Sequence, residues 1–118
     1  MPRQLQPADP ASRADALTAW QAGSATRADL KLLVKDSLAR LQVAAPGHSV
    51  EVRVPPYAAI QCIEGVRHTR GTPPAVIETD ADTWIAVAVG QLAWVDAVQS
   101  GRVRASGERT DLSSYLPL

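Results

Sequence analysis

The sequence predicts a single α+β domain in which helices cover a mostly antiparallel sheet of four strands. Two stretches before residue 46 carry apolar residues at helical spacing, and the period of the pattern changes to two at residue 50. Further on, two short helical stretches between residues 80 and 100 separate the third strand from the fourth. A chain of 118 residues can bury one core of this kind, so we expect one domain over residues 9–118.

A tail and a first helix are expected at the N-terminus. Residues 1–8 hold two prolines and few apolar side chains, which predicts a flexible tail. Asp9 followed by Pro10 is typical of a helix start, and Gly23 is a natural end for that helix. The first helix is therefore predicted to begin at Pro10 and to end just before Gly23.

The second predicted helix has stronger signals at both ends. Thr26 and Asp29 form a variant of the capping box, and Pro46-Gly47 cannot continue the helix beyond about Ala45. Its apolar stripe consists of five residues at helical spacing: Leu30, Leu33, Val34, Leu38 and Leu41. The charged residues of the same stretch are expected to lie mainly off that stripe: Asp29, Lys31, Lys35, Asp36 and Arg40. Such a helix is expected to cover a sheet.

Four stretches after residue 49 have the composition and alternation of strands. Residues 50–54 alternate valine with charged side chains, which predicts a strand with one buried face, and two prolines then predict a turn. Residues 57–63 have apolar side chains on both parities, which favours a more central strand. The third strand is expected at 75–79, and the fourth at 102–105 with Val103 and Ala105 pointing inward.

Two short helices are predicted between Asp80, a good N-cap, and Gly101, with Gly90 between them. Apolar residues lie all round both helices, which indicates either burial on several sides or a ligand that replaces part of the core. The residues expected to line such a ligand site are Trp84, Ile85, Ala88, Leu92, Trp94, Val95 and Val98. Plain hydrophobic core is the alternative. Beyond these helices, Asp111 can cap a last short helix.

Charge and cysteine content restrict the function. Twelve basic and 12 acidic side chains give a net charge of zero, which removes the general electrostatic case for binding nucleic acid or an anionic membrane. The single cysteine, Cys62, excludes an internal disulfide and fits a reducing compartment. The longest strongly apolar run, residues 85–89, is too short to cross a bilayer. We therefore expect a cytoplasmic protein with no transmembrane segment and no nucleic-acid partner.

The residues that could carry catalysis are few. His48, His68 and Cys62 are not arranged at metal-ligand spacing, so neither a metal nor a cofactor is expected. A cysteine inside an apolar strand is more typical of an inert buried thiol than of a nucleophile activated by His68. The sequence therefore does not predict an enzyme.

A polar connection after residue 63 supplies candidate contacts for a ligand head group. Arg67, His68 and Arg70 are three potential cations within four residues, and together they could hold a carboxylate or a phosphate. A solvated loop is the alternative explanation of this cluster. Glu78, at the end of the third strand, is a further candidate, for which a salt bridge to an arginine of that loop is the alternative.

Several strings resemble a known family. They are Val-Glu-Val-Arg-Val-Pro-Pro-Tyr (50–57), His-Thr-Arg-Gly-Thr-Pro-Pro (68–74) and Glu-Thr-Asp (78–80), followed by Trp84, Gly90, Trp94 and Gly101-Arg102-Val103. From about Ser49 onward the sequence resembles the small bacterial, mainly actinobacterial, orthologues of sterol carrier protein type two. The resemblance implies a five-stranded sheet whose helices enclose an apolar tunnel for fatty acyl or sterol-like ligands. The fifth strand would then lie near residues 65–70.

Residues and resemblance together favour a non-enzymatic binding or carrier domain for a small apolar ligand, either fatty acyl, lipid or sterol-like. A structural or interaction module of the same fold, such as a homodimer without a ligand cavity, is the alternative. A third hypothesis is an accessory domain of a partner enzyme. An internal cavity above about 300 Å³ would distinguish the carrier from the interaction module.

Overall fold

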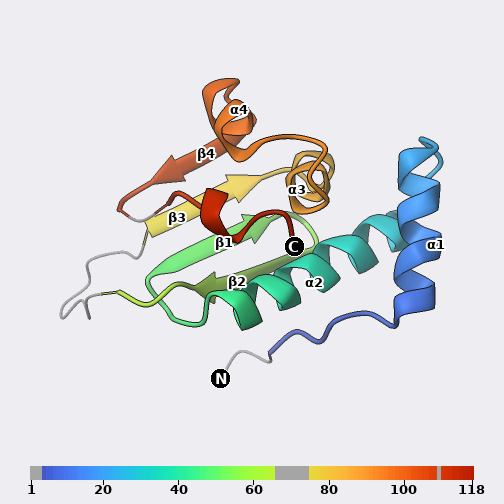
Figure 1. The fold of residues 1–118 in the computed structure, drawn as a ribbon, viewed down its shortest axis with the longest axis horizontal. Coiled ribbons are helices and arrows are strands. Elements are labelled where there is room, and N and C mark those ends of the chain that lie inside the picture. The colour runs from blue at the N-terminus through green and yellow to red at the C-terminus, as the bar shows by residue number, and fades with distance from the viewer. Residues whose placement is uncertain (1–3, 66–74, 109) are drawn as a thin grey trace.

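The computed structural model describes residues 4–65, 75–108 and 110–118. Its elements follow in the order α1 (Pro10–Gln21), α2 (Arg27–Ala44), β1 (Val50–Val54), β2 (Ala58–Cys62), β3 (Ala75–Thr79), α3 (Ala81–Ala88), α4 (Trp94–Gln99), β4 (Val103–Ser106) and the 3-10 helix η1 (Ser113–Tyr115). The helices and strands predicted within these residues are confirmed (Figure 1). The fifth strand expected near residues 65–70 falls outside the described residues, apart from Gly65.

The four described strands form one mixed sheet in the order β2-β1-β3-β4. β1 pairs antiparallel with β2 and β3 pairs antiparallel with β4, while the central pair, β1 and β3, is parallel. The prediction of a mostly antiparallel sheet is therefore confirmed, with one parallel pairing at its centre.

The second strand was predicted to be central, and this is wrong, because β2 lies at an edge of the described sheet. Its burial alternates, with Ile60 and Cys62 buried and Ala59 and Gln61 exposed. The misleading signal came from alanine, which counts as apolar but loses little when it faces water. Apolar residues on both parities therefore indicate a central strand only when the side chains are large.

One face of the sheet carries the core. The register aligns Val52 with Ile60 on one side and with Ile77 on the other, and all three side chains are buried. Ala105 pairs with Ile77 and so shares the inward face as predicted, yet it is exposed. The opposite face carries charged side chains, with ion pairs between Glu51 and Arg53 on β1 and between Glu78 on β3 and Arg104 on β4. The described fold is thus two-layered, with helices on one face of the sheet.

The long helix α2 covers the sheet where β1 and β2 lie, and α1 crosses the first half of α2 (Figure 1). The predicted capping box is present, since Thr26 Oγ1 accepts from the backbone NH of Asp29 while the Asp29 carboxylate accepts from that of Thr26. The stripe predicted for α2 is buried at Leu33, Val34, Leu38 and Leu41 and partly buried at Leu30. The weakly amphipathic α1 buries only one residue, Ala16.

A close backbone approach joins the end of α2 to the end of β2. Gly47 has a φ of +144°, and a Cβ placed on it would lie 2.2 Å from the carbonyl carbon of Ile63. Ile63 itself has a φ of 65°, and its carbonyl oxygen accepts from the backbone NH and the hydroxyl of Ser49 at 3.0 and 2.6 Å. Only glycine fits at position 47, because a side chain there would collide with backbone atoms that cannot rotate away.

Asp80 caps α3 and gives a prediction on pH. Its carboxylate accepts from the backbone NH of Thr83 at 3.0 Å and from its hydroxyl at 2.7 Å. Burial by itself would raise the pKa of Asp80, but the hydrogen bonds from Thr83, together with the backbone NH of Asp80 and the positive charge of Arg102, outweigh burial and lower that pKa. The cap therefore stabilises the fold fully above the unfolded pKa of about 4, and this contribution is lost as the pH falls through the lower pKa of the folded state.

Replacing Asp80 by alanine is expected to reduce the free energy of unfolding by about 1 kcal/mol at pH 7. Urea unfolding at pH 7 and at pH 3 should show that the difference from the unsubstituted chain shrinks in acid. Asp80→Asn is the matched control, because asparagine caps as well as aspartate but does not titrate. An alanine penalty of equal size at both pH values would contradict the proposed role of the charge.

Candidate functional site

An open groove lies between α4, β4 and the segment after β4, with a volume of about 440 Å³. Its described lining consists of Trp94, Val95, Val98, Ala105, Thr110, Asp111 and Ser113. Three of the residues that the sequence predicted as ligand lining, Trp94, Val95 and Val98, are brought together here. Its volume exceeds the roughly 300 Å³ expected of a ligand pocket, but it opens to solvent and is not an internal tunnel.

The groove results from the way in which α4 packs. Trp94 and Ala97 are buried and fix the helix to the core, whereas Val95 is 54% exposed and Val98 is 39% exposed. Among the described residues only one further large apolar side chain, Val43 on α2, is comparably exposed. Because Val95 and Val98 are three residues apart, they share one side of the helix. The groove therefore presents an apolar surface that the described chain leaves uncovered.

The segment after β4 supplies the polar side of the groove. It is anchored by Leu112, which is fully buried, and by the backbone NH of Leu118, which donates to the carbonyl of Ala88 at 2.8 Å. The Asp111 carboxylate accepts from the backbone NH of Ser113 at 2.9 Å, and hydrogen bonds from the side chain and backbone of Ser113 lower the pKa of Asp111. The groove thus carries a negative charge at neutral pH.

The other predicted lining residues lie deeper in the molecule. Trp84 is fully buried, and its indole NH donates to the Ser37 hydroxyl at 2.7 Å. Ile85 and Ala88 border a small hollow between α2 and α3 of about 10 Å³, which holds no more than one water molecule. Leu92 is partly buried against the core between α3 and α4. The seven residues are therefore divided between the open groove and the packed interior.

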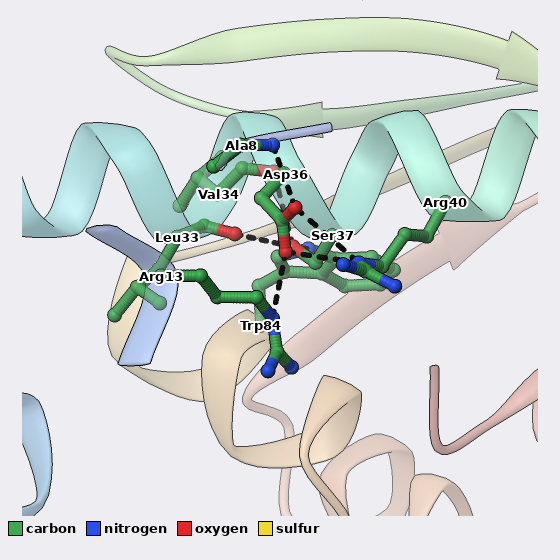
Figure 2. Close-up of polar contacts among 8 residues, drawn as sticks. All are labelled: Ala8, Arg13, Leu33, Val34, Asp36, Ser37, Arg40 and Trp84. Atoms are coloured by element: carbon green, nitrogen blue, oxygen red, sulfur yellow. Dashed lines mark hydrogen bonds and ion pairs between the residues drawn. The ribbon is translucent and has the colours of Figure 1, made fainter. Parts of the chain in front are cut away.

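A buried carboxylate on α2 was missed by the sequence analysis. Asp36, expected to lie off the apolar stripe, is only 2% exposed (Figure 2). Its Oδ2 accepts from Nε of Arg13 at 2.9 Å and from Nε of Arg40 at 3.1 Å, and its Oδ1 accepts from the backbone NH of Ala8 at 2.9 Å. Asp36 is off the leucine stripe, and it is buried because α1 and the preceding residues fold over this side of α2.

The Asp36 cluster joins three parts of the chain, namely the residues before α1, α1 itself and α2. Two arginines facing one carboxylate leave a local charge of +1, and both arginine side chains are partly exposed. The carboxylate has its acceptor positions occupied by donors, so the arrangement is that of a structural tie. One signal in the sequence could have indicated it: Asp36 and Arg40 are four residues apart on the same predicted helix.

Of the four predicted head-group contacts, only Glu78 is among the described residues, and it does not line the groove. Arg67, His68 and Arg70 lie outside the described part of the chain. Glu78 is on the sheet face opposite to the helices, where its carboxylate accepts from Arg104 at 3.1 Å. Among the described residues its partner is Arg104 of the neighbouring strand, and the loop arginines of the alternative explanation lie outside those residues.

Cys62 is fully buried on β2, and burial raises the pKa of its thiol to about 11. The thiol is therefore protonated at neutral pH, as is typical of an inert buried cysteine. His48 bonds through Nδ1 to the Gln61 side chain at 3.0 Å. Within the described ranges, no three His, Cys, Asp or Glu side chains gather as metal ligands, and no helix has the length and apolar character needed to cross a membrane.

Comparison with known proteins identifies the family. The sequence model of the family described as bacterial SCP ortholog, where SCP stands for sterol carrier protein, matches residues 26–118. The chain belongs to this bacterial SCP ortholog family. The match begins at the capping box of α2 and includes all four described strands, so the resemblance to bacterial SCP orthologues is confirmed and extends further toward the N-terminus than Ser49. A search of the curated proteins finds no match.

The matched range includes the elements that form the groove but not the first helix. The elements that form the groove, α4, β4 and the segment after β4, all lie within the matched range, whereas α1 precedes that range. Of the donors to Asp36, Arg40 lies inside the match while Ala8 and Arg13 lie before it. The groove is therefore built on the bacterial SCP ortholog part of the chain, and the Asp36 cluster attaches the N-terminal helix to it.

Proposed function

We propose that the chain is a non-enzymatic binding or carrier domain for a small apolar ligand, which it takes up in the groove between α4 and β4. The observation that carries this proposal is the exposure of Val95 and Val98 in a groove of about 440 Å³. A ligand that covers these two side chains removes apolar surface from water, and each Å² of apolar surface removed contributes roughly 25 cal/mol to the binding free energy. The family supports the same class of function.

The polar lining indicates which head group the ligand carries. Thr110 and Ser113 contribute hydroxyl groups, while the ionised Asp111 would repel a free carboxylate. An uncharged head group, such as a hydroxyl, an ester or an acyl thioester, suits this groove better than a fatty acid. We therefore expect the methyl ester of a fatty acid to bind more tightly than the acid itself at neutral pH.

Fluorescence titration with parinaric acid and with its methyl ester tests the proposal. The chain should bind the ester saturably, and Val98→Asp should weaken that binding at least tenfold, because it places a charge in the apolar part of the groove. Val43→Asp is the matched control, since Val43 is 71% exposed on α2 and does not line the groove. Failure of both probes to bind, or equal effects of the two substitutions, would overturn the assignment.

Two observations favour the alternative of an interaction module. The groove opens to solvent and is not the internal cavity that would distinguish a carrier, and an exposed apolar pair is a common feature of a protein interface. Sedimentation of the unliganded chain distinguishes the two functions. A dimer that Val98→Asp dissociates, together with no saturable probe binding, would assign the groove to a second copy. A monomer that binds the ester supports the carrier.

A further inference from the structure

A second groove of about 380 Å³ lies between the first half of α2 and the turn that joins β1 to β2. Its lining consists of Arg27, Ala28, Lys31, Lys35, Pro56 and Tyr57. The three cations occupy every fourth position of α2, so they form one row along the helix, each about 6 Å from the next along its axis. Neither the predicted ligand site nor the proposed function uses this groove.

The charge in this groove is not neutralised by the described residues. None of its three cations has an ion pair or side-chain hydrogen bond there, whereas Arg13, Arg40, Arg53 and Arg104 are all paired with carboxylates. Like charges four residues apart on a helix repel each other, so this row is mildly unfavourable in the absence of an anion. The zero net charge of the whole chain therefore conceals a local concentration of positive charge.

Carboxylates on the same helix are already engaged elsewhere. Asp29 accepts from the backbone NH of Thr26 in the capping box, and Asp36 is held by Arg13 and Arg40. No carboxylate is among the lining residues of the groove. The opposite wall instead presents the rings of Pro56, which is exposed, and Tyr57, which is half-buried. A ligand here meets positive charge on one side and flat apolar rings on the other.

We propose that this groove binds a phosphate-bearing anion, with the three cations on the phosphate oxygens and the Tyr57 ring against the group that the phosphates carry. Arginine and lysine are the usual protein partners of phosphate, arginine through paired hydrogen bonds and lysine as a point charge. Three cations along a row of about 12 Å can contact more than one phosphate group, so linked phosphates or the head groups of neighbouring phospholipids suit the groove better than a single phosphate. The source is thus either a soluble polyphosphate compound or a phospholipid surface.

Calorimetric titration with ADP and with inorganic triphosphate at low salt tests the soluble source. Co-sedimentation with phosphatidylcholine vesicles, with and without phosphatidylglycerol, tests the lipid source. In each of these assays that detects binding, the double variant Arg27→Ala/Lys31→Ala should bind at least tenfold more weakly than the unsubstituted chain. Tyr57→Ala should weaken ADP binding but leave triphosphate binding unchanged, because only ADP carries a ring system.

The matched control is Arg53→Ala/Arg104→Ala, which removes the same charge from the opposite face of the sheet. It should retain binding within twofold, as should Val98→Asp, so the result does not depend on the apolar groove. Binding in the ADP or triphosphate arm identifies a soluble ligand, and binding confined to phosphatidylglycerol vesicles identifies a lipid surface. Absence of binding in every arm, or equal losses in the two double variants, would overturn the proposal. Thermal unfolding confirms that each variant is folded.

Discussion

Replacing Asp36 by asparagine is expected to lower the free energy of unfolding by about 3 kcal/mol, because it removes a buried charge from its partners. The substitution keeps the shape of the side chain but turns one of its two acceptor oxygens into an amide NH₂, which then faces either the guanidinium groups of Arg13 and Arg40 or the backbone NH of Ala8. The backbone NH of Ala8 is the third donor that depends on this carboxylate. Loss of the tie should therefore loosen the residues before α1 as well as destabilise the whole domain.

Chemical denaturation measures the global effect, and limited proteolysis within residues 4–21 measures the local one. Asp15→Asn is the matched control, since it removes the same charge from an exposed position on α1. We expect the control to change the free energy of unfolding by less than about 0.5 kcal/mol. Equal free energies of unfolding for Asp36→Asn and Asp15→Asn would contradict the prediction. Such a result would show that the Asp36 carboxylate stabilises the fold no more than an exposed carboxylate does.

The starts of α1, α2 and α3 could be predicted because capping is a local property of the sequence. Asp9, Thr26 and Asp80 each accept from the backbone NH three residues later, as expected of caps. The alternating valines of β1 likewise report directly on which face is buried. These features depend on residues within one turn or one strand, so no knowledge of the remaining chain was needed.

Features that depend on distant parts of the chain could not be predicted. Whether β2 lies at the edge or the centre depends on which strand reaches its free side, and Ala58 and Ala59 give little indication. The burial of Asp36 depends on Arg13, which is 23 residues away and on another helix. Sequence spacing brings Asp36 and Arg40 together but does not reveal that α1 covers them.

The candidate ligand residues show the same limit within a single helix pair. Apolar side chains all round α3 and α4 predicted either core or ligand contact, and both environments occur. Trp84 is completely buried in α3, while Val95 and Val98 on α4 are exposed to the groove. Periodicity reports that a side chain avoids water, but it does not identify what covers that side chain. That information comes from the positions of β4 and the segment after it.

Replacing Trp84 by alanine is expected to lower the free energy of unfolding by about 4 kcal/mol, the cost of a large cavity in a packed core. Trp84 has no exposed surface, and its indole NH donates to Ser37 (Figure 2). Trp84→Phe retains most of the packing and should cost about half as much. Ser37→Ala should cost about 1–3 kcal/mol, because it leaves the indole NH buried without an acceptor.

These three variants also separate a core role of Trp84 from a ligand-lining role. If Trp84 is a core residue, its substitution should greatly lower the free energy of unfolding, while the protein that remains folded should bind the parinaric methyl ester with unchanged affinity. A ligand-lining residue predicts the reverse, because removing its ring would enlarge a site without leaving an empty cavity in the packed interior. Urea unfolding and probe titration of Trp84→Phe, the variant most certain to fold, decide between the two. An affinity loss like that of Val98→Asp, with unchanged stability, would extend the ligand site from the α4 groove to α3.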